Sequence, residues 1–314
     1  MPASDPLGRK IRAYYVKLPD QTCIIETAQA SGLTLLSKNE RNPLGASSFG
    51  TGELLMKAAG SGAKKIILGL GGSAVIDGGA GLARACGVRF FNYQGKLLDI
   101  HGGKDLIKIK HIDLSAVPGC LKKIKIYCAC DVNNPLNGKT GAARVFAPQK
   151  GASQSDVRIL AENLLHYGSL LEKICSGASK FPGSGAAGGI AAAMKAFFNA
   201  KIVPGIDFLL HEAQFEKKCR NADLVITGEG RLDRQTLFNK VPAGIAKIAA
   251  RCKIPVIAFA GRVELDTAEI KKCGLKAAFS ITRNLESEES AMANAAQNLY
   301  FTAYNVFNAI NIKK

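Results

Sequence analysis

The sequence has no tryptophan, 7 tyrosines and 4 histidines among its 314 residues. Surfaces that bind single-stranded nucleic acid place aromatic side chains among basic ones, so that bases can stack. The basic cluster between Lys104 and Lys125 has no interleaved aromatic residue. We therefore expect no nucleic-acid partner and interpret this cluster as a solvated face. The histidines fall in no motif, which argues against a histidine-based catalytic triad.

Several other signals are missing. The nine cysteines form no C-x-x-C pair and no Cys/His spacing suited to zinc. No apolar run reaches about 18 residues, and the N-terminus lacks the charged-then-apolar pattern of a signal peptide. P-loop, protein-kinase, H-E-x-x-H and G-x-S-x-G motifs are also absent. We therefore expect a cytoplasmic protein with reduced thiols, no membrane span and no resident metal centre.

Acidic residues are scarce, since 25 Asp and Glu stand against 42 Lys and Arg, a formal net charge of +17. The excess is spread along the chain, so it does not form a basic tail. A positive field favours anionic partners such as phosphates and carboxylates. Hydrophobic residues make up 47% of the chain, enough for a substantial core, and 33 glycines indicate loops built for close backbone approach.

Short β-branched runs alternate with amphipathic stretches, which is typical of an α/β fold. From about His211, three strand–helix units follow one another and predict a doubly wound parallel sheet. We expect a domain boundary near Pro204–Leu210, with domains at 1–208 and 209–314. Predicted elements include strands at Ile124–Asp131, Ala143–Ala147, Ala222–Thr227 and Ile254–Ala260, and helices at Gln154–Cys175 and Glu286–Ile310.

The first candidate site follows the apolar strand Lys65–Leu70. Gly71, Gly72 and Ser73 come next, and Asp77 begins a second glycine-rich run that leads into a helix. Glycines at a strand end let backbone N–H groups approach an anion, and a helix N-terminus adds positive potential. We predict that these four residues bind phosphate or substrate. A tight turn that needs glycine only for its conformation is the alternative.

The second candidate pair is Asp131, at the carboxyl end of a predicted strand, and Lys150 further along the chain. Ligand groups in α/β sheets gather at such strand ends. Lys150 can contact a phosphate, and Asp131 a metal or a substrate hydroxyl. The alternative makes Asp131 an Asx-turn residue and Lys150 a solvated side chain.

The stretch Gly183–Gly189 matches G-x-G-x-x-G, but no apolar strand precedes it, so a dinucleotide-binding interpretation fails. Helix packing and anion contact are the two interpretations that stay open for this stretch.

The segment with the most charged side chains suited to catalysis follows the strand that begins at Ala222. Gly228 and Gly230 flank Glu229, and Arg231 and Asp233 follow, with Lys240 a turn later. Two carboxylates and an arginine at one strand end can organise a metal, a base and a phosphate clamp together. We predict catalytic roles for Glu229, Arg231 and Asp233, and phosphate or substrate binding at Gly228 and Gly230. A solvated salt-bridge loop is the alternative.

Taken in order, these segments resemble the bacterial type I glycerate kinase family. The resemblance covers essentially the whole chain. Its motifs are Ser4–Gly8, Arg41–Leu44, Ser47–Glu53, Gly71–Ala74, Asp77–Gly81, Cys130–Leu136, Pro148–Ala152, Gly183–Gly189, Thr227–Asp233 and Gln235–Leu237.

The resemblance implies phosphoryl transfer from ATP, with Mg²⁺, to a hydroxyl of glycerate, and leaves 2- or 3-phosphorylation open. It also implies a restriction-endonuclease-like domain and a flavodoxin-like domain, with catalytic roles for Asp131 and Lys150. The chain begins at a point several dozen residues into the family's sequence pattern. It also has Val75-Ile76 at the position where the family usually has Thr-Asn. A truncated member with an uncovered strand edge, which invites self-association into homo-oligomers, is therefore expected. A catalytically impaired remnant that retains anion binding is the alternative function.

Overall fold

The computed structural model describes residues 1–237, 241–284 and 286–311, so Lys240 lies outside the described residues. The chain divides into two compact units, Met1–Gly205 and Ile206–Lys314. Both units combine helices with a largely or wholly parallel sheet, so the predicted α/β class is confirmed. Their assignment to restriction-endonuclease-like and flavodoxin-like domains stays a prediction. Within the described ranges, no helix is both long and apolar enough to cross a membrane.

The first unit is built on a five-stranded sheet in the order β3-β4-β5-β8-β9. The contacts β4–β5, β5–β8 and β8–β9 are parallel, and only the short β3 runs antiparallel. The central strand β5 is buried along Ile66–Leu68, as expected for a strand covered on both faces. The strands are β3 (Val16–Lys17), β4 (Thr22–Glu26), β5 (Lys65–Gly69), β8 (Lys125–Ala129) and β9 (Lys201–Val203).

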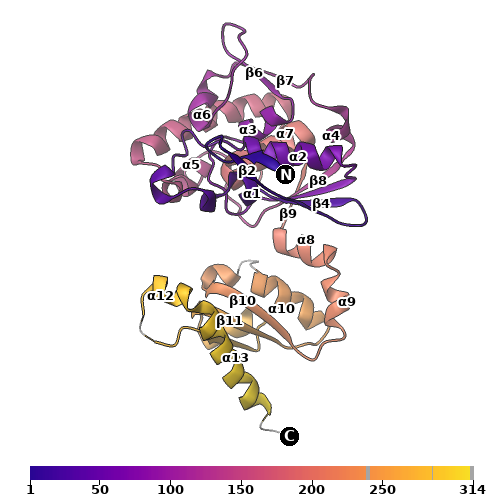
Figure 1. The fold of residues 1–314 in the computed structure, drawn as a ribbon, viewed down its shortest axis with the longest axis vertical. Helices are drawn as coiled ribbons and strands as arrows, with labels where there is room; N and C mark the ends of the chain where they lie inside the picture. The colour runs from indigo at the N-terminus through magenta and orange to yellow at the C-terminus, as the bar shows by residue number, and fades with distance from the viewer. Residues whose placement is uncertain (238–240, 285, 312–314) are drawn as a thin grey trace. The chain divides into compact units, whose positions relative to one another are not determined.

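Helices enclose this sheet, and a β6–β7 hairpin lies apart from it (Figure 1). The longest helix begins at a capping box, in which Ser153 and Asp156 satisfy each other's backbone N–H groups. Its buried face carries Tyr167, which packs against Phe90 of the hairpin. The main helices are α2 (Phe49–Gly60), α3 (Ala80–Ala85), α5 (Ala142–Phe146), α6 (Gln154–Ile174) and α7 (Ile190–Phe198).

Smaller elements complete the first unit and supply several of its loops. The strands are β1 (Pro2–Ser4), β2 (Lys10–Arg12), β6 (Arg89–Phe91) and β7 (His111–Asp113). The short helices are α1 (Ala28–Ser31), α4 (Gly119–Lys123) and the 3₁₀ turns η1 (Leu33–Leu35), η2 (Lys38–Glu40), η3 (Gly103–Lys108), η4 (Pro148–Lys150) and η5 (Ala186–Gly189).

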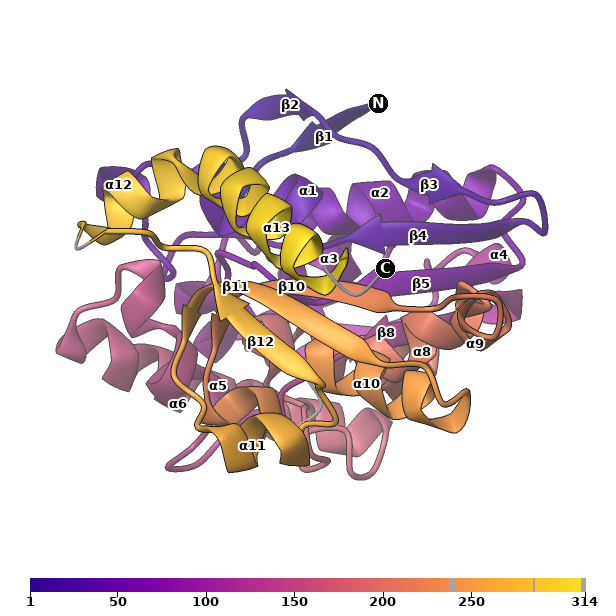
Figure 2. The same ribbon diagram turned by 90° about the horizontal axis from the view of Figure 1, so that it is seen from below.

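The second unit holds a three-stranded parallel sheet in the order β10-β11-β12, as the strand–helix pattern predicts. Both views place α10 on one side of this sheet and α13 on the other (Figures 1 and 2). The elements are α8 (Gly205–Glu212), α9 (Phe215–Cys219), β10 (Val225–Leu232), η6 (Arg234–Leu237), α10 (Val241–Arg251), β11 (Val256–Val263), α11 (Thr267–Lys272), β12 (Ala277–Ser280), α12 (Glu288–Ala293) and α13 (Ala295–Asn311).

Three predicted elements differ from the structure. The predicted strand Ala143–Ala147 is helix α5, because its alanines have high helix propensity and are buried where the helix packs against α6 and η5. The predicted helix Glu286–Ile310 is divided at Asn294, the C-cap of α12. Strand β10 continues to Leu232, well beyond the predicted end at Thr227.

Candidate active site

The loop after β5 presents free backbone donors. Gly72 has φ +69°, a left-handed conformation that glycine adopts without strain. Among the hydrogen bonds of the described residues, none is donated by the backbone N–H groups of Gly71, Gly72 or Ser73. Successive N–H groups around a left-handed residue form a concave anion-binding surface. We call these three residues the Gly71–Ser73 cradle.

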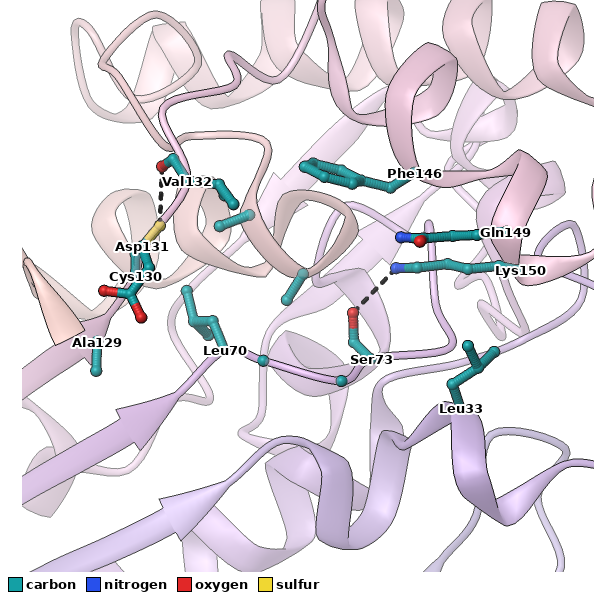
Figure 3. Close-up of a pocket in the computed structure, with 14 residues that line it drawn as sticks. Leu33, Leu70, Ser73, Ala129, Cys130, Asp131, Val132, Phe146, Gln149 and Lys150 are labelled. Atoms are coloured by element: carbon teal, nitrogen blue, oxygen red, sulfur yellow. Dashed lines mark hydrogen bonds between the residues drawn. The ribbon is translucent and has the colours of Figure 1, made fainter. Parts of the chain in front are cut away.

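The cradle is part of the wall of a cavity of about 390 Å³ (Figure 3). The cavity also receives Asp131 from the loop after β8, and Gln149 and Lys150 from η4. Apolar side chains complete its lining. They belong to Leu33, Leu70, Ala129, Val132, Phe146, Ala186 and Ala187.

Lys150 is buried, with 4% of its surface exposed, so the solvated alternative does not hold. Its Nζ donates to Ser73 Oγ at 3.0 Å and to the carbonyl oxygen of Val75 at 2.8 Å. Burial lowers the pKa of Lys150 to about 7, and the negative charge of Asp77 acts in the opposite direction. An ammonium group has three donors, so one remains for a ligand. Ser73 accepts from Lys150, which leaves its own hydroxyl proton available for the same ligand.

Asp131 lies across the cavity from Lys150 (Figure 3). It follows the end of β8, and its Oδ1 accepts a hydrogen bond from the backbone N–H of Gly205 at 2.9 Å. The side chain is exposed, so its other oxygen can reach a ligand. The adjacent Cys130 donates its thiol to the carbonyl oxygen of Val132, and burial raises the pKa of that thiol. Asp131 therefore supplies a carboxylate group to the cavity wall.

Asp77 does not line the cavity. It is fully buried, and its oxygens accept hydrogen bonds from the N–H and hydroxyl of Ser48 and from the N–H groups of Gly79 and Gly81. The predicted contact of Asp77 with phosphate or substrate stays a prediction, since in this structure the carboxylate is buried and does not line the cavity. Burial raises the pKa of Asp77, while the donated hydrogen bonds lower it.

Glycines of the Gly183–Gly189 stretch bring two segments of backbone together. Gly188 has φ +69°, and a Cβ there would collide with the carbonyl oxygen of Val75. Gly78 N–H donates to the Gly188 carbonyl oxygen at 2.9 Å. The packing interpretation therefore accounts for this glycine. Ala187 lines the cavity with φ +51°, a strained conformation for a residue with a side chain.

In the second unit, Glu229 and Arg231 lie within β10, and Asp233 follows the strand directly. Arg231 donates from Nε and Nη2 to Glu264 Oε2, at 3.0 and 2.6 Å. Glu264 also pairs with Arg262, its Oε1 lying 2.9 Å from Nε. The hydrogen bonds and negative charge of Glu264 raise the pKa of Arg231, and the charge of Asp233 adds to this effect. Arg231 thus forms the ion pair that the salt-bridge alternative describes, and the catalytic roles of Glu229, Arg231 and Asp233 stay predictions. Space beside Gly230 is open, whereas a Cβ at Gly228 would meet the carbonyl oxygen of Phe259.

Sequence reasoning assigned no role to Ser48, Gln149, Ala187 or Glu264. Ser48 carried only the signal of an N-cap, a serine before a helical pattern, yet its side chain makes no capping bond and donates to Asp77 instead. The other three carried none, because their positions depend on packing between distant segments. Among the described residues, no group of three His, Cys, Asp or Glu side chains could hold a metal ion.

Comparisons with known proteins identify the family that the chain resembles. The family model described as "Glycerate kinase family" matches residues 1–311. The chain is 43% identical to the glycerate kinase of Halalkalibacterium halodurans over 303 residues, 96% of this chain and 80% of that one. It is 40% identical to the glycerate 2-kinase of Escherichia coli over 303 residues, 96% and 79% of the two chains.

A solved structure is similar too. The crystal structure of a Salmonella typhimurium LT2 protein assigned as glycerate kinase 2 matches with a TM-score of 0.82 and 40% sequence identity. The match covers 99% of this chain and 81% of that one. Similarity of this extent, in sequence and in fold, places the chain in the glycerate kinase family.

Proposed function

We propose that the chain is a glycerate kinase that transfers the γ-phosphoryl group of ATP to a hydroxyl of glycerate. The observation that carries the proposal is the meeting of Lys150, Ser73 and the Gly71–Ser73 cradle in one cavity. Each supplies a hydrogen-bond donor, and Lys150 adds positive charge. Such a donor set binds an oxygen-rich anion, a carboxylate or a phosphate. Relatives that bear the kinase name at 40–45% identity favour this over a remnant that only binds anions.

Phosphoryl transfer is promoted mainly by positioning and by neutralising charge on the transferring group. We propose that Lys150, Ser73 and the cradle bind the anion, and that Asp131 accepts the proton of the attacking hydroxyl as a general base. In the second unit, Arg231 contributes positive charge to the nucleotide phosphates. Gly228 and Gly230 allow β10 to approach those phosphates closely.

Mg²⁺ enters this scheme with the nucleotide. Mg²⁺ keeps several waters and needs only one or two protein carboxylates beside phosphate oxygens. Glu229 and Asp233 are hard oxygen donors of that kind, on and next to β10, so these residues fit the ion. When bound, Mg²⁺ neutralises charge on the phosphates. We also propose that the enzyme acts in the cytoplasm, in line with its nine free cysteines.

A coupled assay of ADP formation with D-glycerate and ATP tests the proposal directly. We expect turnover that requires Mg²⁺, glycerate and ATP together. The Escherichia coli relative is named a 2-kinase, and we propose the same position here, which ³¹P NMR of the product identifies. Binding of D-glycerate with no ADP formation would instead support the anion-binding remnant. Light scattering on the same sample tests the predicted self-association.

Replacing Glu229, Arg231 or Asp233 with alanine should lower kcat at least about 100-fold, the scale of losing a charge-stabilising group. Folding should change little for Glu229→Ala. Arg231→Ala leaves Glu264 paired with Arg262, and this remaining pair limits the structural effect. Steady-state kinetics with circular dichroism of each variant measures both quantities. Near-normal kcat in all three variants would restrict this strand to a structural role.

Gly72→Val should abolish binding of anions to the cradle. Its φ of +69° disfavours a β-branched residue, and the new Cβ would lie 3.3 Å from that of Ala28. Val75→Thr is the control for ligand binding, because the backbone oxygen still accepts from Lys150, so binding should persist although a buried hydroxyl costs some stability. Calorimetric titration with D-glycerate and with a non-hydrolysable ATP analogue measures binding. Unchanged binding of both ligands to Gly72→Val would remove the cradle from the site.

A further inference from the structure

Gln149 lines the cavity, and its side chain points into it in the same direction as that of Lys150 (Figure 3). Lys150 is buried, whereas Gln149 is exposed, so a ligand that enters from solvent can reach its carboxamide. Within the part of the chain that the structure describes, the Gln149 side chain takes part in no hydrogen bond. Both polar atoms of this carboxamide are therefore available to a ligand.

The turn that carries Gln149 is held firmly in place. In η4 the N–H groups of Lys150 and Gly151 each donate, at 3.0 Å, to a carbonyl oxygen three residues earlier. Gly151 ends the turn with φ +93°, and a Cβ there would lie 2.6 Å from the carbonyl oxygen of Arg41. The turn thus packs closely against a distant segment. A side chain on such a fixed backbone loses less freedom when it binds a ligand.

The polar groups of the cavity differ in the hydrogen bonds that they offer a ligand. The N–H groups of the cradle and the ammonium group of Lys150 can only donate, and the carboxylate of Asp131 can only accept. Ser73 already accepts from Lys150, so its proton remains for a ligand. A carboxamide does both, because its oxygen accepts while its NH₂ group donates. Gln149 therefore adds to the cavity an unpaired donor and an unpaired acceptor on one side chain.

D-Glycerate has three polar groups with matching requirements. Its carboxylate only accepts hydrogen bonds, which suits the cradle, Ser73 and Lys150. The hydroxyl that is phosphorylated must give up its proton, which suits Asp131 as the general base. The third group is the other hydroxyl, which both donates and accepts. Once the first two groups are placed as the proposed function has them, Gln149 is the complementary partner for the third.

The rest of the cavity wall offers that hydroxyl no strong side-chain partner. The other lining side chains are apolar, apart from Cys130, whose thiol donates to the carbonyl oxygen of Val132. We infer that Gln149 is a specificity-determining residue, which binds the C3 hydroxyl of D-glycerate and so favours this acid over one with a single hydroxyl. The inference rests on the proposed function, with phosphorylation at C2. A glutamine that contacts only water is the alternative.

Gln149→Met is the decisive variant, since methionine has a similar length and lacks both the donor and the acceptor. The position is exposed, so folding should change little. D-Lactate is the matched ligand, because it differs from D-glycerate only by the missing C3 hydroxyl. Calorimetric titration should show that the wild type binds D-glycerate about tenfold more tightly than D-lactate, the scale of one hydrogen bond between uncharged groups. In Gln149→Met the affinity for D-glycerate should fall about tenfold, and that for D-lactate should stay the same.

Gln154→Met is the control variant. Gln154 is also exposed, in the first turn of α6, and it does not line the cavity, so its replacement should leave both affinities unchanged. Equal binding of the two acids by the wild type would overturn the inference. So would Gln149→Met if it left D-glycerate binding intact or weakened both ligands alike, because neither result depends on the C3 hydroxyl.

These titrations need no turnover, so they separate the inference from the proposed function. A protein that discriminates between the two acids as expected, and forms no ADP, would contradict only the kinase function. A protein that forms ADP from D-glycerate with the same kcat/KM in Gln149→Met and the wild type would contradict only the role of Gln149. If both proposals hold, kcat/KM for D-glycerate should fall about tenfold in Gln149→Met, in parallel with the loss of affinity.

Discussion

Replacing Lys150 with methionine should lower kcat/KM for D-glycerate about 1000-fold at pH 7, the upper end of the range for one charge-stabilising donor. The substitution removes the charged donor of the cavity and leaves an apolar side chain of similar length in a site that is 4% exposed. Ser73 and the Gly71–Ser73 cradle remain, so residual binding should persist. Steady-state kinetics and calorimetric titration measure the two effects separately.

The same variant has a predicted stability signature. The pKa of Lys150 is lowered in the folded state, to about 7, from about 10.4 in an unfolded chain. Between these values the unfolded state binds more protons, so the stability of the wild type should rise with pH from about 7 to 10. Lys150→Met should lack this rise. Denaturant titrations across that range test it, and an identical pH slope in both proteins would contradict the burial of the amine.

Gly188→Ala should have the largest effect on folding, a loss of about 3 kcal/mol or more. The residue has φ +69°, and its new Cβ would overlap the carbonyl oxygen of Val75, a backbone atom that cannot swing away. That same oxygen accepts from Lys150, so relief of the collision would also displace the amine. Chemical denaturation should therefore show reduced stability, and titration should show weakened anion binding.

Gly119→Ala provides the comparison. A Cβ at Gly119 meets nothing within 4 Å, and its φ does not lie in the left-handed region. The residue is the first of α4, where alanine is favourable for a helix. Its unfolding free energy should match or slightly exceed that of the wild type. Equal destabilisation by both substitutions would show that contact with Val75 does not determine the effect of Gly188→Ala.

Much of the fold follows from local patterns. The apolar run before Gly69 is a central parallel strand, and the helical spacing from Gln154 is the longest helix of the first unit. Alanine-rich Ala143–Ala147 was the clear failure, because β-branched Val145 and aromatic Phe146 imitate a strand while neighbouring helices decide the outcome. Single-sequence patterns cannot weigh such packing.

In the candidate site, too, some residues can be predicted from local sequence patterns, whereas others are placed by contacts with distant segments. Glycines and carboxylates at strand ends, such as Gly72 and Asp131, can be predicted from the sequence because parallel sheets gather ligand groups at one edge. Asp77 has the same appearance in sequence, yet two of its four hydrogen bonds come from Ser48, 29 residues earlier, and its carboxylate is buried. The pairing of Arg231 with Glu264 likewise spans 33 residues. Contacts at such separations have no local signature.

The hydrogen bonds of Asp77 connect the beginning of α2 to the beginning of α3, since Ser48 donates to Asp77 and accepts from Leu82. The backbone N–H groups of Ser48, Gly79 and Gly81 donate to Asp77, and that of Leu82 donates to the Ser48 hydroxyl. None can exchange with solvent deuterium unless these hydrogen bonds open. We therefore expect these four amides to exchange with a common, high free energy of opening, so that the segments joined at Asp77 behave as one cooperative folding unit.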